Sequence, residues 1–316
     1  MARRTLVLFL LVLPWVSLAS PAQAQAGGMP TDIEAKLAEL GAVINPPETA
    51  KLYAPLQEKE PYAGIKVTRD LKYGTDERHA LDVFEPDPAG ASPRAVLMFV
   101  HGGGFTAGNK RAPGSPFYDN IALFAVRNGF VGVNVTYRLA PQHQWPAGAE
   151  DVGAAVRWVS ENIRAHGGDP ARVFLMGHSA GAVHVASYIA NPKFHTRRGT
   201  GLAGAILLSG LYDFTKFPPG PPEQAYFGED AAKLAEASTL ALLPETKIRL
   251  MAIYAERDPP NFIEQGKLLQ TTMCRANRCS SVALLGKHSH MSEVYAINTP
   301  DRELSGQIVA FIKGEW

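Results

Sequence analysis

The feature that most constrains the fold is a short apolar run followed by a Gly-x-Ser-x-Gly turn. Residues 172–176 are mostly apolar, the pentapeptide at 177–181 reads Gly-His-Ser-Ala-Gly, and a helical stretch continues through residues 182–190. Small residues beside the serine tolerate the strained strand-to-helix turn that exposes a nucleophilic hydroxyl. The pattern predicts that Ser179 is a nucleophile, although a purely structural turn could have the same sequence.

Strand and helix patterns alternate through the chain. Residues 95–100 and 130–137 are apolar or β-branched, as in central strands covered on both faces. Residues 65–74 and 81–84 alternate apolar with polar, which predicts half-exposed antiparallel edge strands. With no internal linker in 316 residues, the pattern predicts one α/β domain with a mostly parallel central sheet flanked by helices on both faces.

A glycine-rich loop follows the strand at 95–100 and reads His101-Gly-Gly-Gly104. Such a loop presents backbone N–H groups either to a phosphate or to an oxyanion. The loop lacks the Gly-Lys-Ser/Thr ending of a P-loop and the Gly-x-Gly-x-x-Gly spacing of a dinucleotide site, so phosphate binding is set aside. We therefore predict that the N–H groups of Gly103, Gly104 and Ala180 form an oxyanion hole, with a tight structural turn as the alternative.

The overall charge excludes some classes of partner. The formal net charge is +1, acidic and basic residues are well mixed, and no basic run contains interleaved aromatic residues. This composition does not attract nucleic acid. The predicted partner is a small, uncharged molecule.

Residues 1–26 have the pattern of a cleavable signal peptide. Arg3 and Arg4 precede an apolar run at 6–18, and Ala-Gln-Ala triplets at 22–26 offer cleavage sites. The run is short for a membrane span, and an uncleaved anchor is the alternative. The expected location is periplasmic or secreted, without stable membrane association after cleavage.

The expected location bears on the two cysteines, because exported proteins fold in an oxidising compartment. Cys274 and Cys279 lie between a helical stretch and an apolar strand, and disulfides persist in exported proteins. A disulfide between them is the prediction, and two free thiols are the alternative. Two cysteines without a nearby histidine pair do not make a metal site.

Three motifs in order resemble those of a known family. They are His-Gly-Gly-Gly at 101–104, Tyr-Arg-Leu-Ala-Pro at 137–141 with Trp-Pro at 145–146 and Glu-Asp at 150–151, and Gly-His-Ser-Ala-Gly at 177–181. Together they resemble the hormone-sensitive-lipase-like carboxylesterases of the α/β-hydrolase fold. The resemblance covers the chain from about residue 73 onward. It implies hydrolysis of short acyl esters by a Ser-Asp-His triad without metal or cofactor.

One departure from this family concerns the nucleophile motif. Members of its main branch usually have Asp before the serine and Gly-Gly after the alanine, whereas this chain has His178 and Gly181-Ala182. The form found here also resembles arylformamidases and feruloyl-esterase-like relatives. The departure bears on the substrate rather than on the type of reaction.

The acid of the triad is expected after the last-but-one central strand. Asp258, followed by Pro259, lies where the family has its Asp-Pro pair. Glu256 is the competing candidate. Asp213 is a more distant one and is better explained as the cap of a turn.

The base is expected after the last strand, where two histidines compete. The family pattern favours His290, and His288 is the alternative. His101 is interpreted as orienting the oxyanion loop by hydrogen bonding, and His178 as filling space beside the serine turn.

The less regular segments are expected to shape specificity. Residues 45–58 are expected to be irregular because they contain Pro46, Pro47 and Pro55. Residues 27–64 form a small N-terminal cap or covering segment, and residues 213–245 form an excursion that borders the pocket. The predicted function is a serine hydrolase acting on short, uncharged acyl or aryl esters through an acyl-enzyme. The alternatives are arylformamidase-like amide hydrolysis and a catalytically silent binding module.

Overall fold

The computed structural model describes residues 27–316 except residues 91, 198 and 218. The predicted signal peptide at 1–26 lies outside the described residues and stays a prediction. In the described part of the chain, no helix is both long and apolar enough to cross a membrane.

Within the described residues, eight strands form one sheet in the order β1-β2-β4-β3-β5-β6-β7-β8. The strands are β1 Ile65–Lys72, β2 Ala80–Pro86, β3 Arg94–Val100, β4 Val131–Val135, β5 Gly168–His178, β6 Gly204–Leu208, β7 Arg249–Arg257 and β8 Val282–Ser289. The β1–β2 and β2–β4 pairs are antiparallel, and the five other pairs are parallel. The predicted, mostly parallel sheet with antiparallel strands at one edge is confirmed.

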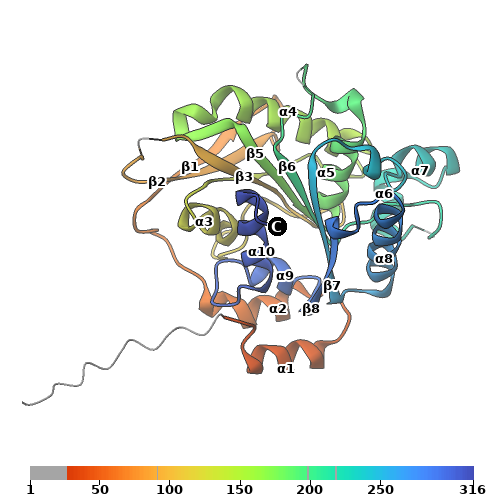
Figure 1. Cartoon of the computed structure of the whole chain (residues 1–316), viewed down its shortest axis with the longest axis horizontal. Coiled ribbons are helices and arrows are strands. Elements are labelled where there is room, and N and C mark those ends of the chain that lie inside the picture. The colour runs from red at the N-terminus through yellow and green to blue at the C-terminus, as the bar shows by residue number, and fades with distance from the viewer. Residues whose placement is uncertain (1–26, 91, 198, 218) are drawn as a thin grey trace, which may run out of the picture.

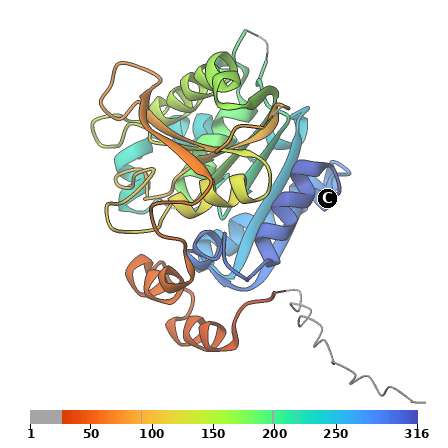
Figure 2. The same ribbon diagram turned by 90° about the vertical axis from the view of Figure 1, so that its left-hand side faces the viewer.

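Helices cover both faces of this sheet (Figures 1 and 2). They are α1 Thr31–Leu40, α2 Pro46–Tyr53, α3 Asp119–Arg127, α4 Ala147–Asn162, α5 Ala180–Ala190, α6 Pro221–Phe227, α7 Ala231–Ala237, α8 Pro260–Arg275, α9 Ser292–Tyr295 and α10 Glu303–Lys313. Short 3₁₀ helices span Ala54–Leu56, Ile163–His166, Pro192–Phe194, Leu243–Glu245 and Cys279–Ser281. Apolar residues of α4, α5 and α8 pack on one face, whereas those of α3 and α10 pack on the other together with α1.

The segment at 45–58 departs from the sequence interpretation, which treated it as irregular because of its prolines. It contains α2 and a 3₁₀ turn. The Asn45 side chain accepts a hydrogen bond from the Glu48 N–H at 3.2 Å and so caps the helix. Pro46 occupies the first helical position, where the missing N–H costs nothing.

The two cysteines are joined in the structure. The Cys274–Cys279 disulfide connects the end of α8 to the 3₁₀ turn before β8. This is the predicted link between a helix and the following strand.

The topology also brings the functional candidates together. Parallel strands β3, β5, β7 and β8 all have their carboxyl ends along the same border of the sheet, the carboxyl edge. The glycine-rich loop follows β3, Ser179 follows β5, Asp258 follows β7 and His290 follows β8. Residues far apart in the sequence therefore meet at one edge.

Candidate active site

Ser179 occupies a strained turn between β5 and α5. Its backbone has φ 55° and ψ −123°, which a non-glycine residue rarely adopts. A Cβ on Gly181 would lie 2.2 Å from the carbonyl oxygen of Val100, so only glycine fits so close to β3. The Ser179 N–H donates to the Leu208 carbonyl oxygen at 2.9 Å, which ties the turn to β6.

Asp258 and His290 are hydrogen-bonded. His290 Nδ1 lies 2.7 Å from Asp258 Oδ1, and both side chains are buried. The second oxygen of Asp258 accepts from the Ser209 hydroxyl at 2.6 Å and from the Ala255 N–H at 2.8 Å. These donors orient the carboxylate, which in turn fixes the His290 ring with its Nδ1 as a donor.

The other carboxylates considered from the sequence lie elsewhere. Glu256 is exposed and accepts from the Lys287 N–H at 2.5 Å. Asp213 accepts from both the N–H and the hydroxyl of Thr215, as a turn cap does. Neither residue contacts a histidine of the site among the described contacts.

His288 is a buried residue near the end of β8, two positions before His290. Its Nδ1 lies 3.1 Å from the Ser292 hydroxyl, and its Nε2 lies 3.3 Å from an Asp301 oxygen. His288 therefore connects the end of β8 to α9 and to the segment before α10. The structure brings His290, not His288, to Asp258.

Ser179 and His290 line one pocket of about 470 Å³. Its lining is mainly apolar and includes Phe105, Leu211, Phe262 and Met291. The His290 Nε2 atom is buried and has no hydrogen-bond partner in the described part of the chain. This nitrogen is therefore free to exchange a proton with a group in the pocket.

The predicted oxyanion donors border the same pocket. Gly103 and Gly104 have positive φ angles of 127° and 58°, and both line the pocket with Ala180. Ala180 is the first residue of α5, where a helix leaves its N–H groups unpaired. Among residues 27–316 as described, none of these three N–H groups donates to a protein acceptor.

His101 supports the glycine-rich loop from behind. Its Nδ1 lies 2.6 Å from the Gly102 carbonyl oxygen, so this nitrogen carries the hydrogen. The ring stacks on Tyr137, whose hydroxyl donates to the His101 carbonyl oxygen at 3.0 Å. Burial lowers the pKa of His101 to about 3, so the imidazole is neutral.

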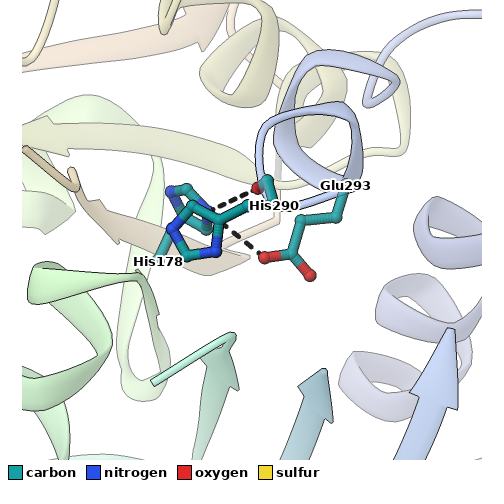
Figure 3. A group of neighbouring side chains, drawn as sticks. All are labelled: His178, His290 and Glu293. Carbon is teal, nitrogen blue, oxygen red and sulfur yellow. Dashed lines mark hydrogen bonds and ion pairs between the residues drawn. The ribbon is translucent and has the colours of Figure 1, made fainter. Parts of the chain in front are cut away.

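Two groups near the base were missed by sequence reasoning. Ser209 follows β6 and orients Asp258, and Glu293 lies in α9 three residues after His290. Glu293 is completely buried, and its Oε1 lies 3.2 Å from His178 Nε2 (Figure 3). No local pattern marks either residue, because each acts through a contact with a distant strand end.

His178, His290 and Glu293 lie close enough to be considered as metal ligands, with candidate atoms within 4.8 Å of one another. Hydrogen bonds already engage one ring nitrogen of each histidine. His178 Nε2 lies 2.8 Å from the His290 carbonyl oxygen, which accepts only, so the nitrogen must carry a hydrogen. His290 Nδ1 is engaged by Asp258. These bonds occupy His178 Nε2 and His290 Nδ1, whereas His178 Nδ1 and His290 Nε2 have no hydrogen-bond partner among the described residues.

Covering segments contribute the remaining walls of the pocket. Ile44 and Pro46 come from the start of α2 and the loop before it, and Pro222 and Glu223 come from α6. Helix α1 contacts β8 and α2 contacts α9, and Figure 2 shows both helices together below the rest of the molecule. The sequence indicated these segments but not their contact residues.

Known relatives agree with this architecture. The chain is 33% identical over 179 residues to a probable carboxylic ester hydrolase, LipM, of Mycobacterium tuberculosis, covering 53% of this chain and 40% of LipM. It is 34% identical over 164 residues to the gibberellin receptor GID1 of Oryza sativa, covering 48% of this chain and 44% of the receptor. The chain thus spans less than half the length of each of these curated relatives.

A solved structure and a family model support the same assignment. The crystal structure of esterase B from Lactobacillus rhamnosis superposes with a TM-score of 0.69 at 16% identity, covering 90% of this chain and 94% of that one, which shows a shared fold. A family described as alpha/beta hydrolase fold matches residues 97–260, just over half of the chain. The resemblance inferred from the motifs is confirmed, and the chain belongs to this α/β-hydrolase-fold family.

Proposed function

We propose that this protein is a serine carboxylesterase that cleaves small esters through an acyl-enzyme. The Ser179 oxygen attacks the ester carbonyl while His290 Nε2 takes its proton, and Asp258 stabilises the resulting imidazolium. The N–H groups of Gly103, Gly104 and Ala180 bind the negative oxygen that develops. His290 then protonates the leaving alcohol, and water attacks the acyl-enzyme by the same steps.

One observation carries the proposal. His290 is held by Asp258 through Nδ1, its Nε2 has no partner among the described residues, and both His290 and Ser179 line the same pocket. A serine hydroxyl is a weak nucleophile at neutral pH and needs a neighbouring base of this kind. Unpaired backbone donors beside the serine supply the second requirement of acyl transfer.

The pocket supports a small, uncharged substrate. A volume of about 470 Å³ is at the small end of ligand sites, and most of its lining is apolar. Short acyl or aryl esters fit this description.

The test is hydrolysis of p-nitrophenyl acetate, butyrate and octanoate by the wild type and by Ser179→Ala. We expect hydrolysis of the short esters, and a loss in the variant of about three orders of magnitude or more. Labelling of the wild type by a fluorophosphonate, followed by peptide mapping, identifies the nucleophile independently. Equal activity in the variant, or label on another residue, would contradict the proposal.

Small-molecule binding without turnover is the second candidate, favoured by the similarity to a protein named as a gibberellin receptor. A silent module would bind the same esters at equilibrium, with no release of p-nitrophenol. The presence of Ser179, Asp258 and His290 supports the esterase proposal over this one.

A further inference from the structure

His178 and Glu293 join the nucleophile turn to the loop that carries His290. His178 is the last residue of β5, directly before Ser179, and Glu293 lies in α9. The His178 Nε2–H donates to the His290 carbonyl oxygen at 2.8 Å (Figure 3). Glu293 Oε1 lies 3.2 Å from the same nitrogen. The base loop is thereby attached to the strand that presents the nucleophile.

The ring of His178 also contacts the ring of the base. The His178 and His290 centroids are 4.7 Å apart, and Phe262 approaches His290 to 4.5 Å. His178 therefore contacts His290 in two ways: it donates to the His290 backbone carbonyl, and its ring packs against the His290 ring. The two contacts can be separated by substitution.

The charge state of Glu293 follows from its surroundings. It is completely buried, neither of its oxygens has a hydrogen-bond partner among the described residues, and His178 is the one basic side chain that it contacts there. Burial lowers the pKa of His178 to about 4, so this partner is neutral. Burial raises the pKa of Glu293 well above its usual range, and the nearby Asp258 carboxylate raises it further.

We propose that His178 and Glu293 are a pair of positioning residues that hold His290 at a fixed place relative to Ser179. The inference rests on the proposed function, because the positioned group is its general base. It also gives a role to His178, where the main branch of the family usually has Asp.

The kinetic test separates hydrogen bonding from packing. Glu293→Ala and His178→Phe should each lower kcat by roughly 10- to 100-fold, because a base displaced by about 1 Å loses that much. KM for p-nitrophenyl butyrate should stay within about twofold, because binding contacts are retained. His178→Ala also removes the ring contact and should lose more than His178→Phe.

Glu293→Gln is the conservative variant, since an amide resembles an uncharged acid in shape. It should recover most of the kcat lost in Glu293→Ala. Charged and titratable groups near Glu293 are His178, Tyr212, Asp258, His288 and His290. If Glu293 is uncharged, Gln leaves the acid-limb pKa of kcat/KM unchanged. Removal of a carboxylate would lower that pKa by about one unit or more.

Glu85→Ala is a matched control. Glu85 is also a buried carboxylate, but it lies on β2 and contacts Lys66 and His166 outside the pocket. All rates are normalised to the amount of folded protein measured by circular dichroism. Unchanged kcat in Glu293→Ala and His178→Phe would overturn the inference and leave the proposed function standing. A shifted acid limb in Glu293→Gln would do the same, because Glu293 would then act on His290 through its charge. Absence of ester hydrolysis in the wild type would overturn the proposed function and the positioning role with it.

Discussion

The carboxyl edge of the sheet and the cover, which contributes Ile44, Pro46, Pro222 and Glu223, form the pocket in different ways. Ser179, Asp258 and His290 follow strand ends and are at most 8% exposed. Ile44, between α1 and α2, lines the same pocket but is 46% exposed. The sheet edge holds its groups from several sides, whereas the cover presents side chains from a short helix–loop segment.

This difference separates reaction from recognition. Groups at the sheet edge are held by hydrogen bonds from neighbouring strands, such as the Ser209 and Ala255 donors to Asp258. Precise placement of this kind matters for the chemical step. Apolar side chains of the cover have no such network and can only change which substrates fit. Substitutions at the edge should therefore change kcat, and those in the cover should change KM.

The largest effect is expected from Asp258→Asn. An amide can donate to His290 Nδ1 and stabilise the wrong tautomer, so kcat/KM should fall by roughly 10³- to 10⁴-fold. Glu256→Gln is the control, because Glu256 is exposed and bonded to the Lys287 N–H. Steady-state hydrolysis of p-nitrophenyl butyrate measures both. A comparable loss in Glu256→Gln would make Glu256 the acid.

Gly104→Ala tests whether the glycine-rich loop supplies donors. A Cβ at this position, with φ 58°, would lie 3.3 Å from Pro222 Cβ and displace the loop. Loss of donor alignment should lower kcat by about 10- to 100-fold. Gly114→Ala is matched to it, because Gly114 has φ 75° and open space around its Cβ position. Equal losses in both variants would show that backbone strain, not the oxyanion contact, is responsible.

His184 lies beneath α6, where the cover meets the sheet, and contacts the rings of Phe105, Tyr137 and Tyr226. Burial lowers its pKa to about 3. Below about pH 6.5 the unfolded chain binds a proton here that the native state does not, so acid destabilises the fold. As the pH falls below about 6.5, the free energy of unfolding should therefore decrease in both proteins. For each pH unit the decrease should be about 1.4 kcal/mol smaller in His184→Phe than in the wild type.

Urea unfolding at pH 7, 6 and 5 measures that difference. His101 and His178 are also buried, with pKa values lowered to about 3 and about 4, so both proteins should lose stability in acid. Parallel decreases in the wild type and in His184→Phe would show that His184 is protonated in the native state.

The smallest effect is expected in the cover. Ile44→Ser removes part of an apolar wall that is already half exposed, so KM for p-nitrophenyl octanoate should rise by about threefold with kcat unchanged. Val43→Ser is the control, because Val43 is 47% exposed and does not line the pocket. A decrease in kcat in Ile44→Ser, or an equal rise in KM in Val43→Ser, would contradict the proposed difference between the carboxyl edge and the cover.

The sequence predicted those parts of the site that depend on local backbone geometry. The serine turn needs small neighbours, and the glycine-rich loop needs conformations that other residues avoid, so both are visible as motifs. The segment at 45–58 was misjudged because its prolines were taken as breaks. Pro46 in fact begins α2, with Asn45 as its cap. A proline is compatible with the first turn of a helix, as Pro46 and Pro47 show, and sequence alone did not define where that turn begins.

Pairs of competing candidates were decided by the tertiary structure. Asp258 and Glu256 lie two residues apart, as do His290 and His288, yet the end of β7 and the end of β8 bring only Asp258 and His290 into contact. The hydrogen bond between His178 and the His290 backbone joins residues 112 positions apart. The sequence by itself determined the fold class, the serine turn and the glycine-rich loop, because these depend on neighbouring residues. Strand order and loop path decided the partners of each side chain, because such contacts exist only once the sheet has formed.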